Sequence, residues 1–338
     1  MKNFAGGAGS TWYDGSSLSP EQVAPEHPDI LCVVLLFLFI ISKMGRHTRR
    51  VYPPGAPKCH PRVIGRKKEE GCLPTGVYAQ IAGTGTGSQE GGRDASHSKT
   101  RKGDVARLRR AAAAKVGCEE DGSDRCLLEN SGLGAAKVSE LEKQWLRPKM
   151  PEDWKKQPDK WLDTYNIENV MKQYAEVRPD FKFMGAIPID FSAPDPYSKG
   201  GEQKKCLYDE TCKMSLGDLK NKGVKYVGFV FNLDPHFKNG SHWVSMMLDI
   251  MRRECNFFDS YGMEPHPLIA RLMRSFKLQD PGLKLNYNAR RFQFGESQCG
   301  MYCIFFLSTM LDGTRFKKFV KTSVPDYEMQ NLRQWVFS

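Results

Sequence analysis

A cysteine at the end of a glycine-containing turn is the residue of this sequence best suited to nucleophilic chemistry. The turn is Gln293–Gly300 (QFGESQCG), and the apolar run Met301–Leu311 follows it, so Cys299 lies where a helix is predicted to begin. Backbone N–H groups at a helix N-terminus lack intrahelical partners, and the helix dipole is positive there. Both features favour the thiolate, which is the nucleophilic form of cysteine and is favoured further by a nearby cation. The chemistry therefore requires a histidine.

His242 and Asp259 are the residues predicted to activate this thiol. His242 lies in the alternating run Ser241–Asp249, and Asp259 ends the run Glu254–Asp259. We predict two antiparallel strands joined by a turn centred just before Met251, a register that pairs His242 with Asp259. A carboxylate in that position orients the imidazole and stabilises the imidazolium ion.

Other residues compete for these two roles. Asp249 lies on the same strand as the histidine but too far from the pairing position, and Glu254 is expected at the surface. His236 and His266 both lie beside prolines in predicted loops, so we expect them to be solvated.

The elements that must hold the site are predicted from periodicity and residue preference. Apolar spacing predicts an amphipathic helix over Ile167–Tyr174. Residues rich in β-branched and aromatic side chains predict strands at Phe181–Phe191 and Val224–Asn232. Strong helix formers predict a helix at Asp104–Val116 with an aspartate cap, and a short helix is expected within Gly71–Ala82.

Length and charge limit the class of protein. The 338 residues, 40% of them apolar, suffice for one good core and a second region. The net charge of +11 and the pI near 9.1 favour an acidic partner, such as nucleic acid, an acidic protein or an anionic membrane.

The ten cysteines form no compact framework, so we expect reduced thiols and an intracellular protein. Zinc ligation by the set Cys59, His60, Cys72, Cys118 and Cys126 is not predicted, because this set lacks CxxC or HxxxH spacing.

Composition divides the N-terminal part of the chain. Residues 1–29 are rich in Gly, Ser and Pro and are expected to be disordered. Residues 30–43 form an apolar segment, a candidate membrane anchor whose run ILCVVLLFLFII (30–41) is shorter than the roughly 17–25 residues of a full span. If it inserts, the basic residues after it place the C-terminal portion in the cytoplasm. The alternatives are an interfacial helix, a signal-peptide core, or translation that starts at Met44.

Two larger regions follow this segment. Residues 44–140 form a basic accessory region whose proline-rich arm is either a solvated tail or a surface for nucleic acid or anionic membrane. Residues 141–338 are predicted to be the catalytic domain.

The order of these motifs resembles that of a known family. His242-Trp243, then Asp259, then Gln293 before Cys299-Gly300 is similar to the cysteine proteases of the SUMO-deconjugating and adenovirus-maturation type. The resemblance implies an α+β papain-like fold with a central mixed sheet and a nucleophile-bearing helix, together with a partly disordered, partly helical N-terminal extension. It implies that the histidine is the general base, the aspartate its orienting acid, the cysteine the nucleophile and the glutamine a donor to the oxyanion. It implies no metal and no cofactor.

A second motif extends the resemblance, which covers about residues 155–315. The run Trp161–Tyr174 (WLDTYNIENVMKQY) is similar to proteases of large cytoplasmic DNA viruses, including iridoviruses and the African swine fever group. It implies that Trp161 and Trp243 bind substrate in a narrow channel. Gln298 departs from the family, because cellular relatives often carry Asp before the nucleophile, and we expect altered electrostatics in an active enzyme.

The resemblance also implies a biological setting. The expected substrates are viral structural or core polyprotein precursors, cleaved at Gly-Gly-type sites during virion maturation by a monomeric enzyme in the host cytoplasm and the virion. Deubiquitinases, deSUMOylases and bacterial acetyltransferases use the same order of base, acid and cysteine. A non-catalytic, basic virion structural protein with this fold is a further alternative.

Overall fold

The computed structural model describes residues 52–53, 56–63, 66–84, 102–120, 122–196, 198 and 205–338. The chain divides into a first unit, Met1–Arg49, and a second unit, Arg50–Ser338, which contains every described residue. The expectations for residues 1–29 and for the apolar segment 30–43 lie outside the described residues, as does the start of the basic arm. Among the described residues, none of the helices has the length and hydropathy needed to cross a bilayer.

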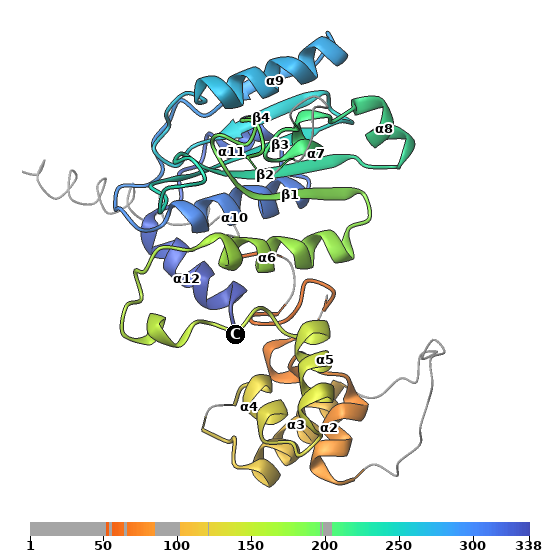
Figure 1. Ribbon diagram of the computed structural model, residues 1–338. Helices are drawn as coiled ribbons and strands as arrows, with labels where there is room; N and C mark the ends of the chain where they lie inside the picture. The colour runs from red at the N-terminus through yellow and green to blue at the C-terminus, as the bar shows by residue number, and fades with distance from the viewer. Residues whose placement is uncertain are drawn as a thin grey trace, which may run out of the picture. The chain divides into compact units, whose positions relative to one another are not determined.

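A five-stranded mixed sheet is the centre of residues 141–338, the region predicted to be catalytic and called the catalytic region below (Figure 1). Strands β1 and β2 are parallel, β2, β3 and β4 pair antiparallel in succession, and β4 and β5 are again parallel. The strands are β1 (Phe181–Pro188), β2 (Tyr226–Asn232), β3 (Trp243–Asp249), β4 (Glu254–Phe258) and β5 (Lys284–Tyr287). The expected central mixed sheet is therefore present.

Helices cover both faces of this sheet, so side chains on both faces of its central strands are buried. In β2, Phe229 and Phe231 belong to one core cluster and Val230 belongs to the other. The cluster of the two phenylalanines includes residues of α8 (Leu216–Asn221) and α9 (Pro267–Gln279). The cluster of the valine includes residues of α6 (Thr164–Val177), α10 (Cys299–Leu311), α11 (Phe316–Phe319) and α12 (Asp326–Val336).

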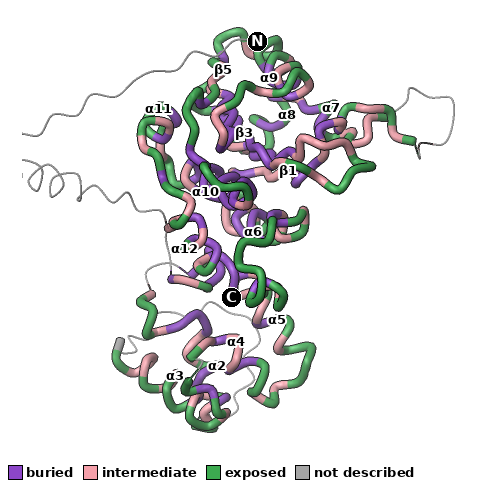
Figure 2. Tube along the Cα trace, turned by 90° about the vertical axis from the view of Figure 1, so that its left-hand side faces the viewer, coloured by how far each residue is buried: buried purple, intermediate pink, exposed green. Residues whose placement is uncertain are grey.

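Helix α10 is the most deeply buried helix of the catalytic region (Figure 2). Every residue of it except Thr309 is buried, as expected for a helix that is apolar on all sides. Phe306 stacks on Phe258 of β4 with ring centroids 5.1 Å apart. The helix that carries the candidate nucleophile is thus fixed by the core.

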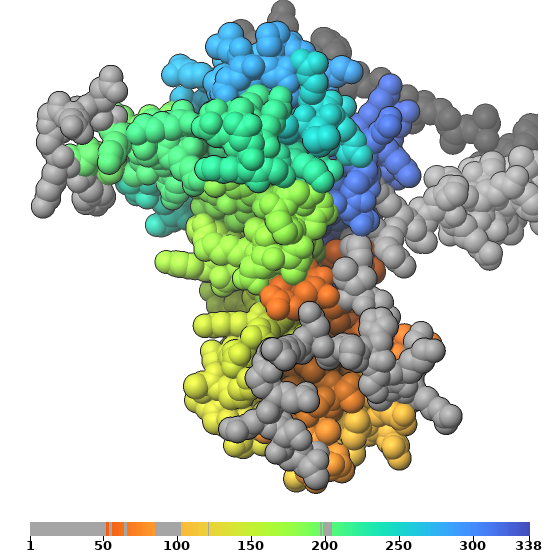
Figure 3. Space-filling view, turned by 90° about the vertical axis from the view of Figure 1, so that its right-hand side faces the viewer, coloured from red at the N-terminus to blue at the C-terminus, as the bar shows by residue number. Residues whose placement is uncertain are grey.

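The segment between β1 and β2 forms part of the surface shown in Figure 3. There, the yellow-green atoms of α6 and β1 lie beside the green atoms of α7 (Asp209–Cys212) and α8. A cavity of about 460 Å³ between these elements is lined by residues that include Phe181, Phe183 and Met214.

The accessory region has a small helical core of its own. Asp124 organises it, because its carboxylate accepts hydrogen bonds from the backbone N–H of Cys72, the hydroxyl of Tyr78 and the guanidinium of Arg109. The predicted end of this region at residue 140 falls inside its last helix. The helices are η1 (Lys68–Glu70), α2 (Thr75–Ala82), α3 (Lys102–Val116), α4 (Asp124–Glu129) and α5 (Ala135–Trp145), and η2 (Glu152–Lys155) follows them.

The expectation of reduced thiols is wrong for six cysteines. The structure contains the disulfides Cys59–Cys72, Cys118–Cys126 and Cys206–Cys212. The four cysteines of the rejected zinc set are therefore paired with one another, and no group of metal-ligating side chains occurs among the described residues. Sequence spacing did not reveal the pairs Cys59–Cys72 and Cys118–Cys126, because folding of the helical region, and not a short motif, brings their Cα atoms within bonding reach.

Several element boundaries differ from the prediction. Strand β1 ends at Pro188, where the predicted strand continues to Phe191, because a turn follows in which Phe191 N–H donates to the Pro188 carbonyl. Helix α3 begins at Lys102, so Asp104 lies in the first turn, where a carboxylate is favourable to the dipole, and is not the cap.

Candidate active site

Cys299 is the first residue of α10 and is 2% exposed. Gln298 occupies the N-cap position and makes no side-chain capping bond. The turn before it is anchored by Asp326 of α12, whose carboxylate accepts from the backbone N–H groups of Phe294 at 2.9 Å and Gly295 at 2.8 Å. The thiol therefore lies at the positive end of a helix, and the loop before that helix is held in place by α12.

His242 and Asp259 are in direct contact. His242 Nε2 lies 2.7 Å from Asp259 Oδ1, and the same oxygen accepts from the backbone N–H of Tyr261 at 2.9 Å. Asn288 holds the aspartate from both sides, because its side chain accepts from Asp259 N–H at 2.9 Å and donates to the Asp259 carbonyl at 2.6 Å. Asp259 is buried, so this carboxylate is rigid and shielded from water.

The contact arises from a register that differs from the predicted one. The predicted register sets Ser245 opposite Asn256, whereas the ladder pairs Ser245 with Phe258. A shift by an even number of residues keeps each side chain on its face of the sheet, so the two functional residues still share a face. Both lie just beyond the paired strands, since β3 begins at Trp243 and β4 ends at Phe258. The predicted direct pairing is wrong, but the predicted neighbourhood is present.

The surroundings of His242 favour its protonated form. Burial of the ring acts to lower the pKa, but the hydrogen bond to Asp259 and the hydrogen bond and charge of Cys299 outweigh it and raise the pKa of His242 to about 9. Because Nε2 is used by the carboxylate, Nδ1 is the ring nitrogen left for the thiol. Tyr261 stacks on the imidazole at a centroid distance of 4.7 Å and covers one of its faces.

Gln293 lies beside the site, with its amide already occupied. The side chain is fully buried; its Oε1 accepts from the Ser260 hydroxyl at 2.7 Å, and its Nε2 donates to the Gly295 carbonyl at 2.8 Å. The second amide hydrogen points to the Tyr261 hydroxyl at 3.4 Å, the weaker contact. Donation to an oxyanion therefore requires that this weaker contact be released.

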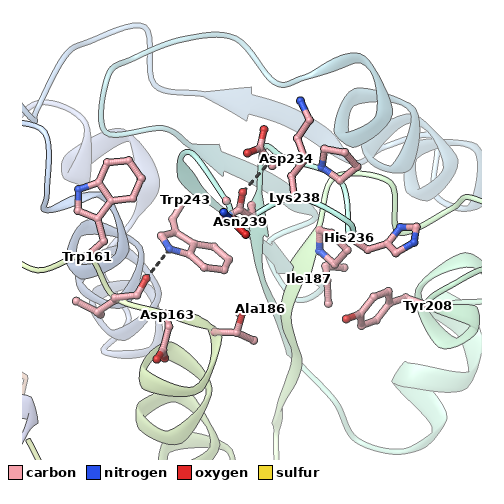
Figure 4. Close-up of a pocket in the computed structure, with 16 residues that line it drawn as sticks. Trp161, Asp163, Ala186, Ile187, Tyr208, Asp234, His236, Lys238, Asn239 and Trp243 are labelled. Atoms are coloured by element: carbon pink, nitrogen blue, oxygen red, sulfur yellow. Dashed lines mark hydrogen bonds between the residues drawn. The ribbon is translucent and has the colours of Figure 1, made fainter. Parts of the chain in front are cut away.

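Trp161 and Trp243 line one cavity of about 370 Å³ (Figure 4). Figure 4 shows the two tryptophans at one end of this pocket and His236 and Tyr208 at the other. The Trp243 indole donates to the Leu162 carbonyl at 2.8 Å, which joins the residue after His242 to the residue after Trp161.

Gly300 explains how the tryptophan segment approaches the nucleophile so closely. A Cβ atom added to Gly300 would lie 3.0 Å from the Cβ of Leu162, closer than most real contacts. The glycine after Cys299 thus allows the Trp161-Leu162 segment to pack against the first turn of α10.

The competing residues have other contacts. His236 pairs with Asp190 at 2.7 Å, and Asp249 pairs with Arg252 at 3.0 Å. His266 accepts from Leu268 N–H at 3.3 Å and so caps α9.

Cysteines 255 and 303 are buried and free of disulfides. Burial raises the pKa of both thiols, and the nearby charge of Cys299 raises the pKa of Cys303 further. Among the described residues, the buried, free cysteines are 255, 299 and 303, and of these Cys299 is the one that the structure places in contact with a histidine.

Three supporting residues were not anticipated from the sequence. Tyr261 and Asn288 hold the histidine and the aspartate, and Asp326 holds the loop before the nucleophile. Tyr261 could have been found as the second residue after Asp259, whereas no sequence pattern marks Asn288 or Asp326.

Comparison with known proteins gives relatives of one kind. A scan against protein-family models finds no match. A protein of Acanthamoeba polyphaga mimivirus, named as a thiol protease, is 27% identical over 224 residues, which cover 64% of this chain and 69% of that protein. The "SUMO-1 cysteine protease" of African swine fever virus is 25% identical over 186 residues, which cover 52% of this chain and 67% of the relative.

A solved structure shares the fold. A crystal structure of the African swine fever virus protease matches with a TM-score of 0.56 at 16% identity, covering 86% of this chain and 98% of the other. This likeness shows that the two chains share a fold. The sequence relatives indicate that the chain is a cysteine protease, similar to the viral thiol proteases of mimivirus and African swine fever virus.

Proposed function

We propose that the protein is an endopeptidase that cleaves viral structural or core polyprotein precursors at Gly-Gly-type sites during virion maturation. The observation that carries this proposal is the joint placement of Cys299 at a helix N-terminus, of His242 against Asp259, and of two tryptophans on the adjoining pocket. The viral relatives support the setting.

The proposed reaction proceeds through an acyl-thioester. The Cys299 thiolate attacks the scissile carbonyl carbon, and the carbonyl electrons move to oxygen, where the backbone N–H of Cys299 and the released amide hydrogen of Gln293 stabilise the oxyanion. The His242 imidazolium gives its proton to the departing amine as the C–N bond breaks. Water, deprotonated by the neutral imidazole, then hydrolyses the thioester and restores the thiolate.

We assign small residues on the acyl side of the scissile bond to the pocket lined by Trp161 and Trp243, whose lining does not include Cys299 or His242. Trp161 is 45% exposed and lies at its rim, whereas Trp243 is buried. Glycine has no Cβ, so it is the residue that best permits a backbone to pass closely between large side chains.

Peptide hydrolysis tests the proposal. The full chain is incubated with a peptide library that carries Gly-Gly, Ala-Ala or Leu-Leu before the scissile bond, and the products are identified by mass spectrometry. We expect cleavage after Gly-Gly, complete loss in Cys299→Ala, and retention in the matched variant Cys303→Ala. Equal cleavage of the Gly-Gly, Ala-Ala and Leu-Leu peptides would overturn the proposal, and so would cleavage by Cys299→Ala.

A deSUMOylase is the second candidate, because one relative carries SUMO-1 in its name. This candidate predicts that the enzyme prefers a folded SUMO or ubiquitin domain to a short peptide. A SUMO or ubiquitin probe with a C-terminal thiol-reactive group would label Cys299 much faster than a Gly-Gly peptide with the same group. Equal rates for the two probes would favour the precursor protease.

We also propose that the enzyme acts as a monomer in the host cytoplasm and the virion, and that the basic region 44–140 binds nucleic acid or anionic membrane. The net charge of +11 supports this binding. Affinity for duplex DNA should fall steeply with salt as counterions are released. A DNA affinity that does not change with salt concentration would contradict the nucleic-acid proposal. Co-flotation of the protein with anionic vesicles tests whether the basic region binds membranes.

A further inference from the structure

Arg333 is a buried cation on α12 that reaches the segment before Trp161. Its side chain is 3% exposed, and its Nη1 donates to the carbonyls of Pro158 and Lys160, both at 2.8 Å. Its Cζ lies 4.5 Å from the centroid of the Trp154 ring. One guanidinium therefore holds two backbone carbonyls that come shortly before the tryptophan of the substrate pocket.

This placement costs stability. Arg333 Nε and Nη2 are buried and have no hydrogen-bond partner among the described residues. Burying a guanidinium that is incompletely paired is unfavourable. Burial lowers the pKa of Arg333 to about 10, against the opposing charges of Asp159 and Cys299. A cation kept at such a cost against the segment before Trp161 indicates a role in holding that segment.

Helix α12 contacts both the loop before Cys299 and the segment before Trp161. Asp326, Gln330 and Arg333 lie at positions i, i+4 and i+7, which share one helix face. Asp326 holds the loop before Cys299, and Gln330 donates to the carboxylate of Asp159, next to the carbonyls that Arg333 binds. The helix therefore fixes the loop before the nucleophile and the segment before Trp161 relative to each other.

We propose that Arg333 is a positioning residue for Trp161: by fixing the carbonyls of Pro158 and Lys160, it sets where the tryptophan wall lies relative to Cys299. This inference rests on the proposed function, because it takes Trp161 as a residue that binds substrate. Arg333 itself contacts neither the substrate nor the reacting atoms.

The variant Arg333→Met tests this role. Methionine keeps an apolar stem against Trp154 but removes the charge and both hydrogen bonds to the carbonyls. We expect kcat/KM for a Gly-Gly peptide to fall roughly 10- to 100-fold, because a misplaced wall disturbs the bound geometry. KM should change more than kcat, and Arg333→Lys should restore part of the loss. The exposed neighbour Gln334 provides the matched control, Gln334→Ala, which should match the wild type.

Two readouts separate positioning from a structural role. Iodoacetamide does not need the channel, but the charge of Arg333 acts on Cys299. The rate of alkylation is therefore compared in Arg333→Lys, which keeps the charge, and should be unchanged there. The melting temperature of Arg333→Met should hold or rise. Amide hydrogen exchange over residues 157–162 should quicken in the variant whether or not a peptide substrate is known.

A double-mutant cycle with Trp161→Ala completes the test. If Arg333 acts through Trp161, the double variant should be no slower than the slower single variant. Additive losses, a drop in the iodoacetamide reactivity of Arg333→Lys, or unchanged exchange over residues 157–162 in Arg333→Met would overturn the inference. Failure of the proposed function would instead appear as a wild-type enzyme that cleaves no Gly-Gly peptide.

Discussion

Asp259→Asn should move the alkaline limit of activity to lower pH. The imidazolium of His242 must be present to protonate the leaving amine, so kcat/KM falls as pH rises through the pKa of this histidine, about 9. Raising that pKa from 6.5 to about 9 corresponds to roughly 3 kcal/mol in favour of the protonated ring. Part of this free energy comes from the hydrogen bond to Asp259 at 2.7 Å and part from Cys299.

The amide removes the charge but keeps an oxygen that accepts from Nε2, so the orientation of the ring persists. Loss of an opposite charge at hydrogen-bond distance lowers the pKa of a histidine by roughly 1–3 pH units. We therefore expect the alkaline limb of the kcat/KM profile to shift down by a similar amount. The rate at the new optimum should be reduced less than the rate above pH 8.

The assay is peptide hydrolysis from pH 5 to 10, with iodoacetamide alkylation of Cys299 over the same range. Asp249→Asn is the matched control, because Asp249 is also a buried aspartate of this sheet but pairs with Arg252. Its alkaline limb should stay in place. An unmoved limb in Asp259→Asn, or an equal movement in both variants, would refute the account of how His242 keeps its proton.

Three further predictions concern stability and support of the site. Cys118→Ser removes a disulfide with a sequence separation of 8 and should lower the free energy of unfolding of the helical region by about 2.5 kcal/mol. Denaturant unfolding without reductant measures this change. Equal stability of the wild type with and without reductant would contradict the prediction. Gly300→Ala should cost roughly 1–3 kcal/mol, because its Cβ crowds Leu162, and should raise KM; a fully active, equally stable variant would show that Leu162 yields freely. Asn288→Ala removes both hydrogen bonds to the Asp259 backbone and should reduce kcat/KM while the melting temperature falls, and a loss of stability alone would make Asn288 purely structural.

Much of the fold could be predicted from local sequence patterns. The spacing of Ile167, Val170, Met171 and Tyr174 indicated α6, and all four side chains are buried. The apolar run after Cys299 indicated α10. The register of β3 and β4 was misplaced because periodicity fixes the face of a strand but not its pairing, which depends on the turn. Arg253 adopts a left-handed conformation, with φ of 53°, in that turn, and nothing in its residue type predicts it.

The candidate site divides in the same way. His242, Asp259 and Cys299 could be named because their chemistry is recognisable in single residues and in their order. Asn288, Asp326 and Arg333 could not, because each acts through hydrogen bonds to backbone groups far away in the sequence. Every residue type has the same backbone N–H and carbonyl groups, apart from proline, so such partners leave no sequence pattern. The disulfides were missed for a related reason, since tertiary contacts decide which cysteines meet.

Burial of α10 ties the chemistry of this enzyme to its global stability. Cys299 begins a helix whose residues, except Thr309, are buried. A local movement of this helix would expose the core, so we do not expect such a movement to displace the nucleophile. Slow exchange of the α10 amides should follow the free energy of complete unfolding. Control of this enzyme must then act on what reaches the thiol, through the tryptophan wall and the loop before Cys299. We therefore expect the position of Cys299 to be lost in the same cooperative transition in which the domain unfolds.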